Sequence, residues 1–230
     1  MFSCDVAAIV AERAYAFFDV DNTLIDAVSM FSFQAYWYRK TGERDAQAAF
    51  DGEIAALRRQ GAPREFINRR YYAHFAGREV VRVERCAEEW FGHLERSRPD
   101  LYHDAVIAEL RGHQAAGREA VLVSGSFPAL LARLASRLGV RHLLATSMEV
   151  EDGRYTGRIF DPQTIGAGKA TAIGRFLERM QAPAGACYAY GDHSSDLPML
   201  QAVGHPNVVR GDPALEAYAQ TAGWRILAAR

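Results

Sequence analysis

Two aspartates near the start of the chain have the spacing expected of a nucleophile and an acid/base that act on a phosphate ester. Asp19 and Asp21 stand in the segment FFDVDNTLI, directly after a short apolar run. Two carboxylates at positions i and i+2 beyond a strand end converge on one point if the chain turns there. One can then attack phosphorus while the other handles the proton of the leaving group. A polar turn that caps a helix explains the same residues equally well, since Asp and Asn are common in turns.

Two further segments offer groups that bind phosphate oxygens. In VLVSGS, Ser124 ends an apolar run, and Gly125 allows the backbone to come close to a ligand. The alternative, a helix N-cap at Ser126 before Pro128, explains Ser126 but leaves Ser124 less explained. In GAGKATAI, Lys169 stands at the start of an amphipathic helix, where the helix dipole disfavours a cation unless an anion lies close by. Taken alone, Lys169 is more simply interpreted as a surface lysine.

A fourth segment, YAYGDHSSDLPML, contains two carboxylates after another apolar run and a glycine. Asp192 comes directly after that glycine, and Asp196 follows four residues later. Hard oxygen ligands at a strand end suit Mg²⁺, which prefers carboxylates together with waters and substrate phosphate. The alternative is a turn in which Asp196 caps the helix that begins at Pro198.

Short apolar runs alternate with helical patterns over most of the chain and would position these four segments. The runs expected to form strands are 15–18, 119–123, 143–146, 187–190, 208–209 and 224–227. One helical face is predicted from Leu130, Leu131, Leu134 and Leu138, and another from Ile173, Phe176, Leu177 and Met180. Strands that alternate with helices indicate an α/β fold with a parallel central sheet covered on both sides, a three-layer Rossmann-like core.

The stretch 26–99 interrupts this alternation, because its pattern is helical throughout and rich in aromatic residues. We therefore predict a helical cap of residues 26–99 inserted after the first strand, with residues 1–25 and 100–230 forming the core domain. A smaller insertion, 149–159, carries Asp152–Gly153 between short polar and apolar segments, which predicts a β-hairpin.

Three of the four polar segments follow predicted strands, and ligands of open α/β sheets bind at the carboxyl ends of the strands. Asp19, Asp21, Asp192 and Asp196 would repel one another strongly there without a cation. Mg²⁺ and Lys169 would supply the positive charge. A nucleophile, an acid/base, a metal site and phosphate-binding donors are together what phosphoryl transfer needs.

The composition favours an ordinary globular enzyme and argues against several classes of partner. With 49% hydrophobic residues and a formal net charge of −1, nothing favours nucleic acid or an anionic membrane as a partner. An arginine-rich stretch from Arg58 to Arg85 is interpreted as a solvated helix face. The cysteines, Cys4, Cys86 and Cys187, are odd in number and widely spaced, which argues against disulfides and zinc, and Cys187 is expected to pack as a small apolar side chain.

The chain shows neither a signal peptide pattern at its N-terminus nor a long apolar stretch. The first residues lack a basic start and a small-residue cleavage site, and no run of about 18 uncharged apolar residues occurs. A cytoplasmic location is therefore expected. The sequence leaves the oligomeric state open, a homodimer included.

At this point the sequence resembles the haloacid-dehalogenase-like hydrolases, in particular subfamily IB, which includes phosphoserine phosphatases. All four motifs occur in the family order from Asp19 to Asp196. The resemblance implies that Asp19 is the nucleophile and a Mg²⁺ ligand, and that Asp21 is the acid/base and binds Mg²⁺ through its carbonyl. It also implies that Ser124, Gly125 and Lys169 hold the phosphoryl group. Asp192 would be a direct metal ligand, with Asp196 supporting the metal or Lys169 from behind.

The same resemblance implies a Mg²⁺-dependent phosphatase that hydrolyses a small phosphorylated metabolite through an aspartyl-phosphate. Phosphoserine-specific relatives typically carry a glutamate shortly after the first motif, where this chain reads DAVSM. Its fourth motif also has Ser195 where those relatives carry an asparagine. Met30, Phe31 and Phe33 are expected to face the active site, and Met30 and Phe31 to select the substrate. Phosphoserine and histidinol phosphate stay open as substrates, and so does a phosphotransferase or phosphomutase that uses the same intermediate.

Overall fold

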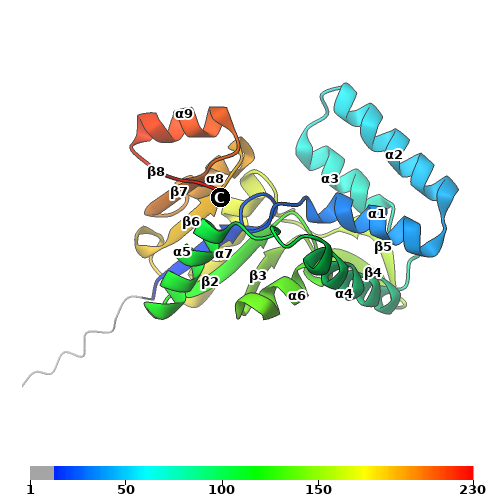
Figure 1. Cartoon of the computed structure of the whole chain (residues 1–230), viewed down its shortest axis with the longest axis horizontal. Coiled ribbons are helices and arrows are strands. Elements are labelled where there is room, and N and C mark those ends of the chain that lie inside the picture. Colours follow the sequence, from blue (N-terminus) through cyan, green and yellow to red (C-terminus); the bar gives the residue numbers. More distant parts are fainter. Residues whose placement is uncertain (1–12, 230) are drawn as a thin grey trace, which may run out of the picture.

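A six-stranded parallel sheet lies at the centre of the molecule, which the computed structural model describes over residues 13–229 (Figure 1). The strand order is β3-β2-β1-β6-β7-β8, so the first strand lies in the middle. The strands are β1 Tyr15–Asp19, β2 Glu119–Ser124, β3 His142–Ala145, β6 Tyr188–Gly191, β7 His205–Val209 and β8 Arg225–Leu227. All six predicted strands are present. β1 and β2 each reach one residue further than predicted, so that Asp19 and Ser124 are themselves the last residues of strands.

Helices cover both faces of this sheet. They are α5 Asp104–Ala115 and α6 Pro128–Leu138 on one face, and α7 Ala167–Met180, α8 Leu197–Gln201 and α9 Pro213–Ala222 on the other. Side chains of a strand point alternately to the two faces, and β1 shows this directly. Phe18 packs in the apolar cluster under α5 and α6, whereas Phe17 packs in the cluster under α7, α8 and α9. The predicted three-layer α/β fold is confirmed.

Four helices lie between β1 and α5 in the chain, as the pattern of residues 26–99 predicts. They are α1 Ser29–Thr41, α2 Arg44–Arg59, α3 Arg64–Ala73 and α4 Val80–Ser97. Most of their aromatic side chains are buried among themselves and against the core. Phe33, for example, contacts Phe75, Trp90 and Phe127, the last of which precedes α6. The helical segment and the sheet thus share one continuous apolar cluster.

The second predicted insertion is the antiparallel hairpin of β4 Met148–Glu151 and β5 Arg154–Ile159. Its turn residues Asp152 and Gly153 both have positive φ, as expected for a tight hairpin turn. The hairpin packs against α3. Gly157, with φ of +84°, allows this approach, because a Cβ there would lie 3.1 Å from the carbonyl oxygen of Ala73.

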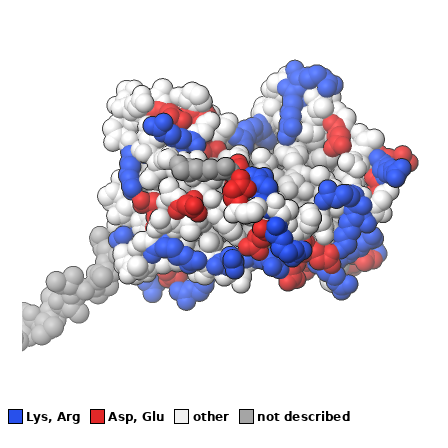
Figure 2. All heavy atoms as spheres, in the orientation of Figure 1, with Lys and Arg blue, Asp and Glu red and all other residues white. Residues whose placement is uncertain are grey.

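Charged side chains of both signs are spread over the face drawn in Figure 2, which is hollowed between α9 and the α2–α3 pair. Within residues 13–229, no helix combines the length and the apolar character needed to cross a membrane. Cys187 is buried in the apolar cluster under α7, as predicted, and Cys86 is also buried and free. The predictions for Cys4 and the first residues fall outside the described part of the chain.

The stability of the fold should fall in acid through His113, which is buried on α5. Its Nε2 lies 2.8 Å from the Tyr190 hydroxyl, and its Nδ1 accepts a hydrogen bond from Arg118 Nε at 2.8 Å. Burial, and then the Arg118 charge, lower the pKa of His113 to about 4. The folded protein therefore excludes a proton that the unfolded chain binds below about pH 6.5. The stability that neutral His113 contributes is complete above that pH and is lost as the pH falls towards 4.

A His113→Gln variant isolates this contribution from the other titrating groups. We expect wild type to be more stable than the variant at pH 7.5, with the difference shrinking by about 1–2 kcal/mol at pH 4.5. Urea unfolding of both proteins at several pH values measures that difference. A difference that stays constant over this pH range would contradict the assignment.

Candidate active site

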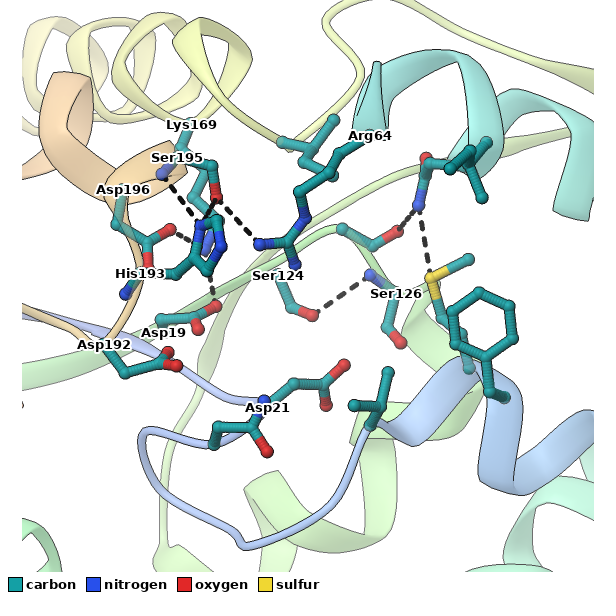
Figure 3. A pocket seen from close by; sticks show the side chains of 18 of the residues that line it. Asp19, Asp21, Arg64, Ser124, Ser126, Lys169, Asp192, His193, Ser195 and Asp196 are labelled. Atoms are coloured by element: carbon teal, nitrogen blue, oxygen red, sulfur yellow. Dashed lines mark hydrogen bonds and ion pairs between the residues drawn. The ribbon is translucent and has the colours of Figure 1, made fainter. Parts of the chain in front are cut away.

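The predicted nucleophile, phosphate-binding and metal-binding residues meet at the carboxyl edge of the central sheet (Figure 3). Asp19 ends β1, Ser124 ends β2, and Asp192 directly follows β6. These three strands are neighbours, with β1 between β2 and β6, so the residues that follow them lie side by side. Lys169 reaches the same point from the first turn of α7.

A buried lysine links two of the carboxylates. Lys169 Nζ lies 2.5 Å from Asp19 Oδ1 and 2.6 Å from Asp196 Oδ1. The side chain of Thr23 donates to Asp192 Oδ1 at 2.8 Å and lies 3.4 Å from Asp19 Oδ2. The anion that a lysine at a helix N-terminus requires is thus supplied by the protein itself. The interpretation of Lys169 as a surface lysine is wrong, because only 4% of it is exposed.

The charges of this cluster are not balanced by protein groups alone. Burial raises the pKa of Asp19 to about 8, in spite of Lys169 and with a further increase from Asp196. Burial and Asp196 likewise raise the pKa of the Asp192 carboxyl. Although burial opposes it, the pKa of Lys169 is raised by Asp19 and Asp196. Negative charge is therefore in excess at a desolvated point, and a cation would relieve it.

A divalent cation fits the donors at this point. Asp19, Asp192 and Asp196 each offer a carboxylate oxygen, and the three oxygens lie within 4.8 Å of one another. Carboxylate oxygens are the ligands that Mg²⁺ prefers, and few protein ligands suffice because it retains waters. Asp196 already binds Lys169 through Oδ1 and accepts the His193 N–H through Oδ2 at 3.3 Å. Asp192, which uses only Oδ1 to accept from Thr23, is therefore the carboxylate best placed for direct ligation, and Asp19 Oδ2, whose one contact is the 3.4 Å contact with Thr23, is the next.

Asp21 lies beside this cluster, and only one of its two carboxylate oxygens takes part in a hydrogen bond. Ser29 donates to its Oδ2 at 3.0 Å, whereas Oδ1 has no hydrogen-bond partner among the described residues. Burial, and then the negative charge of Asp19, raise the pKa of Asp21 to about 7. A carboxyl group that titrates near neutral pH can both donate and accept a proton, as an acid/base must.

The Ser124–Gly125–Ser126 loop is held in place by the helical segment. The carbonyl oxygen of Gly125 accepts hydrogen bonds from Asn68 at 3.1 Å and from the Tyr72 hydroxyl at 2.6 Å, both on α3. Within the loop, the Ser126 N–H donates to Ser124 Oγ at 3.0 Å. The residue that caps α6 is Phe127, so the N-cap interpretation of Ser126 is wrong. Sequence reasoning missed Asn68 and Tyr72, since neither belongs to a motif.

A cavity of about 380 Å³ lies between this edge and the helical segment. The wall of the cavity that lies across from the sheet edge is lined by Val28, Met30, Phe31, Arg58, Arg64, Ile67 and Asn68. Met30 and Phe31 therefore lie where the sequence placed them. The expectation for Phe33 is wrong: it is fully buried among the aromatic side chains of the helical segment and does not line the cavity.

The arginine-rich stretch is only partly a solvated face. Arg69 and Arg70 form surface ion pairs with Asp161 and Glu53, which agrees with that interpretation. Arg58 and Arg64 instead line the cavity, and Arg64 Nη1 lies 3.4 Å from Ser195 Oγ. These two residues, at the end of α2 and the start of α3, are exposed as that interpretation expects, but they also line the cavity. The break between these helices thus places both residues beside the cavity.

The fourth motif forms a short 3-10 helix that fixes Asp196. His193 Nδ1 accepts the Ser195 N–H at 3.0 Å, while Asp196 accepts the His193 N–H. Asp196 therefore caps this turn and binds Lys169 at once. It also occupies the N-cap position of α8, but its side chain makes no capping hydrogen bond to that helix, so the alternative of a helix cap does not account for its carboxylate. Burial, and then the charge of Arg64, lower the pKa of His193.

Residues 16–201 match the family model of the haloacid dehalogenase-like hydrolases. The chain belongs to this family. Three curated relatives align along most of its length. A probable phosphatase of Mycobacterium tuberculosis is 34% identical over 94% of this chain and 75% of its own. A phosphoserine phosphatase of the same species is 31% identical over 93% and 70%. A histidinol-phosphatase of Neisseria meningitidis is 28% identical over 92% and 97%.

Two solved structures share this architecture. A protein of unknown function from Bordetella pertussis Tohama I superposes with a TM-score of 0.83 at 29% identity, covering 95% of this chain and all of the other. A phosphoserine phosphatase with a phospho-aspartyl intermediate analogue superposes with a TM-score of 0.64 at 17% identity, covering 95% and 94%. The resemblance inferred from the four motifs is confirmed at the level of family and fold.

Proposed function

We propose that this family member is a Mg²⁺-dependent phosphatase that hydrolyses a small phosphomonoester through an aspartyl-phosphate on Asp19. The observation that carries the proposal is the cluster in which Lys169 bridges Asp19 and Asp196 beside Asp192. Ser124 and Asp21 lie against the same cavity. The names of the relatives agree on a phosphatase but differ in substrate, so they support the reaction and leave the leaving group open.

The arrangement supports a reaction in two steps. In the first, a carboxylate oxygen of Asp19 attacks phosphorus, the bond to the leaving-group oxygen breaks, and Asp21 gives that oxygen a proton. In the second, Asp21 takes a proton from water, which attacks phosphorus and releases phosphate and the Asp19 carboxylate. The second step restores the starting state of the enzyme, because Asp21 regains its proton and Asp19 regains its negative charge.

The remaining residues would bind and orient the phosphoryl group. Lys169 and the Ser124 hydroxyl would hold its oxygens, with backbone N–H groups of the loop at Gly125. The divalent cation, when bound to Asp19, Asp192 and the Asp21 carbonyl, would neutralise charge that develops on the phosphoryl oxygens. Asp196 would keep the Lys169 ammonium pointed at Asp19, since it binds the same nitrogen.

Phosphate release from p-nitrophenyl phosphate tests the proposal and should depend on a divalent cation. We expect activity with Mg²⁺, loss of it in excess chelator, and recovery when Mg²⁺ is restored. Ca²⁺ should inhibit, because it prefers more ligands and longer distances than Mg²⁺. Full activity in excess chelator would rule out the metal-dependent reaction. Acid-quenched enzyme should carry phosphate on the peptide that contains Asp19, and an alcohol added as acceptor should yield little transfer product.

A further inference from the structure

The hydroxyl of Thr23 lies between the two carboxylates that are best placed to bind a divalent cation. It donates to Asp192 Oδ1 at 2.8 Å and lies 3.4 Å from Asp19 Oδ2. A hydroxyl has a single proton to donate, so the shorter contact takes it. This hydrogen bond holds one oxygen of Asp192 and leaves the other for a cation. The position of the Thr23 side chain therefore decides how the two carboxylates, which lie side by side in Figure 3, can share one ion.

The carbonyl group of Thr23 is held by the ring of a buried histidine. His103 Nδ1 lies 2.9 Å from the Thr23 carbonyl oxygen, and only 4% of His103 is exposed. A carbonyl oxygen can only accept, so Nδ1 carries the proton. Thr23 is fully buried, and within residues 13–229 no other group donates to its carbonyl. Without the imidazole, a buried acceptor would lose its partner, and the loop that contains Thr23 would have to shift to find another.

The backbone of His103 is fixed on both sides of the ring. Its N–H donates to the carbonyl of Leu24 at 3.0 Å, and its own carbonyl accepts two N–H groups from the first turns of α5, both at 3.0 Å. Next to it, Ile25 and Tyr102 form an antiparallel bridge. The two segments by which the chain leaves and re-enters the core, 24–26 and 101–103, thus pair with each other directly beside Thr23. The ring of His103 therefore has a rigid support from which to hold the Thr23 carbonyl.

We propose that His103 is a positioning residue for the divalent cation and acts through Thr23. By holding the carbonyl of Thr23, it keeps the Thr23 hydroxyl on Asp192, so that Asp192 and Asp19 present their remaining oxygens to one ion. His103 does not line the cavity and takes no part in proton transfer. The proposal rests on the metal-dependent phosphatase proposed above.

Calorimetric binding of Mn²⁺ to the whole, substrate-free chain tests the proposal without relying on turnover. His103→Leu removes the donor but keeps a side chain of similar size, and it should weaken Mn²⁺ binding by about tenfold or more. His103→Asn should recover most of this loss, because its amide nitrogen can take the place of Nδ1.

His113→Leu is the matched control. His113 is as deeply buried as His103, but its ring forms hydrogen bonds with Tyr190 and Arg118 and not with Thr23. Its replacement should change Mn²⁺ binding by less than about twofold. Thermal unfolding in chelator shows whether each variant is folded. If His103→Leu does not fold, His103→Gln takes its place, since the amide nitrogen of glutamine reaches past the position of Nδ1.

A double-mutant cycle with Thr23→Val shows whether His103 acts through Thr23. Thr23→Val removes the hydroxyl and should itself weaken Mn²⁺ binding. In that background His103→Leu should weaken it by less than about a further twofold, because the hydroxyl that His103 positions is gone. A residue that served only the stability of the fold would weaken binding by the same factor with or without the threonine hydroxyl.

Hydrolysis of p-nitrophenyl phosphate gives a second measure of the same effect. His103→Leu should raise the Mg²⁺ concentration for half-maximal rate, and should change KM for the ester at saturating Mg²⁺ by less than about twofold.

Three results would overturn the proposal while the phosphatase activity stands. They are Mn²⁺ binding by His103→Leu that is as tight as in wild type, an equal loss in His103→Asn and His103→Leu, and losses that multiply fully in the double variant. If the wild-type protein neither binds Mn²⁺ nor hydrolyses p-nitrophenyl phosphate with Mg²⁺, the proposed function itself fails.

Discussion

Replacing Asp19 by asparagine is expected to lower kcat at least about a hundredfold, equivalent to about 2.7 kcal/mol or more in transition-state stabilisation. An amide oxygen is too weak a nucleophile to replace a carboxylate oxygen at phosphorus. The amide has nearly the same shape as the carboxylate, so the hydrogen bond to Lys169 can persist through its oxygen. The loss should therefore appear in kcat on every substrate, including p-nitrophenyl phosphate.

The fold of the Asp19→Asn variant should be at least as stable as that of wild type in the absence of metal. Because burial raises the pKa of Asp19 to about 8, the folded protein disfavours the ionised carboxylate at neutral pH. The neutral amide removes that cost and the repulsion by Asp192 and Asp196. Denaturant unfolding in chelator measures this, and Asp152→Asn, in the exposed hairpin turn, is the matched control. More than about one per cent of wild-type kcat in Asp19→Asn would remove Asp19 from the role of nucleophile.

The arrangement of the sheet and its acidic edge could be predicted because both depend on local pattern. A buried parallel strand is a short apolar run, and side chains that follow such strands meet at one edge whatever the loops do. Asp19, Ser124 and Asp192 are therefore neighbours by topology alone. The location of Lys169 at this edge had to be inferred indirectly. Only its unfavourable position at a helix N-terminus indicated that an anion lies close by.

The helical segment could be recognised but its contacts could not be assigned. Which side of a helix faces the active site depends on how the helices cross, and sequence spacing does not fix that angle. Phe31 and Phe33 are two positions apart in the same helix, yet Phe31 lines the cavity whereas Phe33 is buried away from it. Asn68 and Tyr72 reach the Gly125 carbonyl only because α3 lies across the loop.

The two arginines that line the cavity could not be told apart from their neighbours in the sequence either. A stretch rich in arginine is usually solvated, and most members of this one are exposed or paired with surface carboxylates. Arg58 and Arg64 are exposed as well, and differ from the others in lining the cavity, on either side of the break between α2 and α3. Charge alone could not separate them from their neighbours, since the sequence does not show which helix ends face the cavity.

Removing the carboxylates of Asp192 and Asp196 one at a time should have different effects on metal binding. Asp192 uses one oxygen to accept from Thr23 and has the other available for a cation. Both oxygens of Asp196 are already engaged, by Lys169 and by the His193 N–H. We therefore expect Asp192→Ala to raise the Mg²⁺ concentration for half-maximal activity by about a hundredfold or more, and Asp196→Ala by about tenfold at most.

Asp196→Ala should act mainly on kcat, because it leaves Lys169 with a single carboxylate partner and loosens the turn that begins at His193. Activity titrations with Mg²⁺, and calorimetric binding of Mn²⁺ to the substrate-free variants, separate the two effects, since the second measurement does not depend on turnover. Thermal unfolding in chelator shows whether each variant is folded. If both variants bind Mn²⁺ as tightly as wild type, the cation does not use these carboxylates. If Asp196→Ala binds it more weakly than Asp192→Ala, the direct ligand is Asp196, and Lys169 must then be held by Asp19 alone.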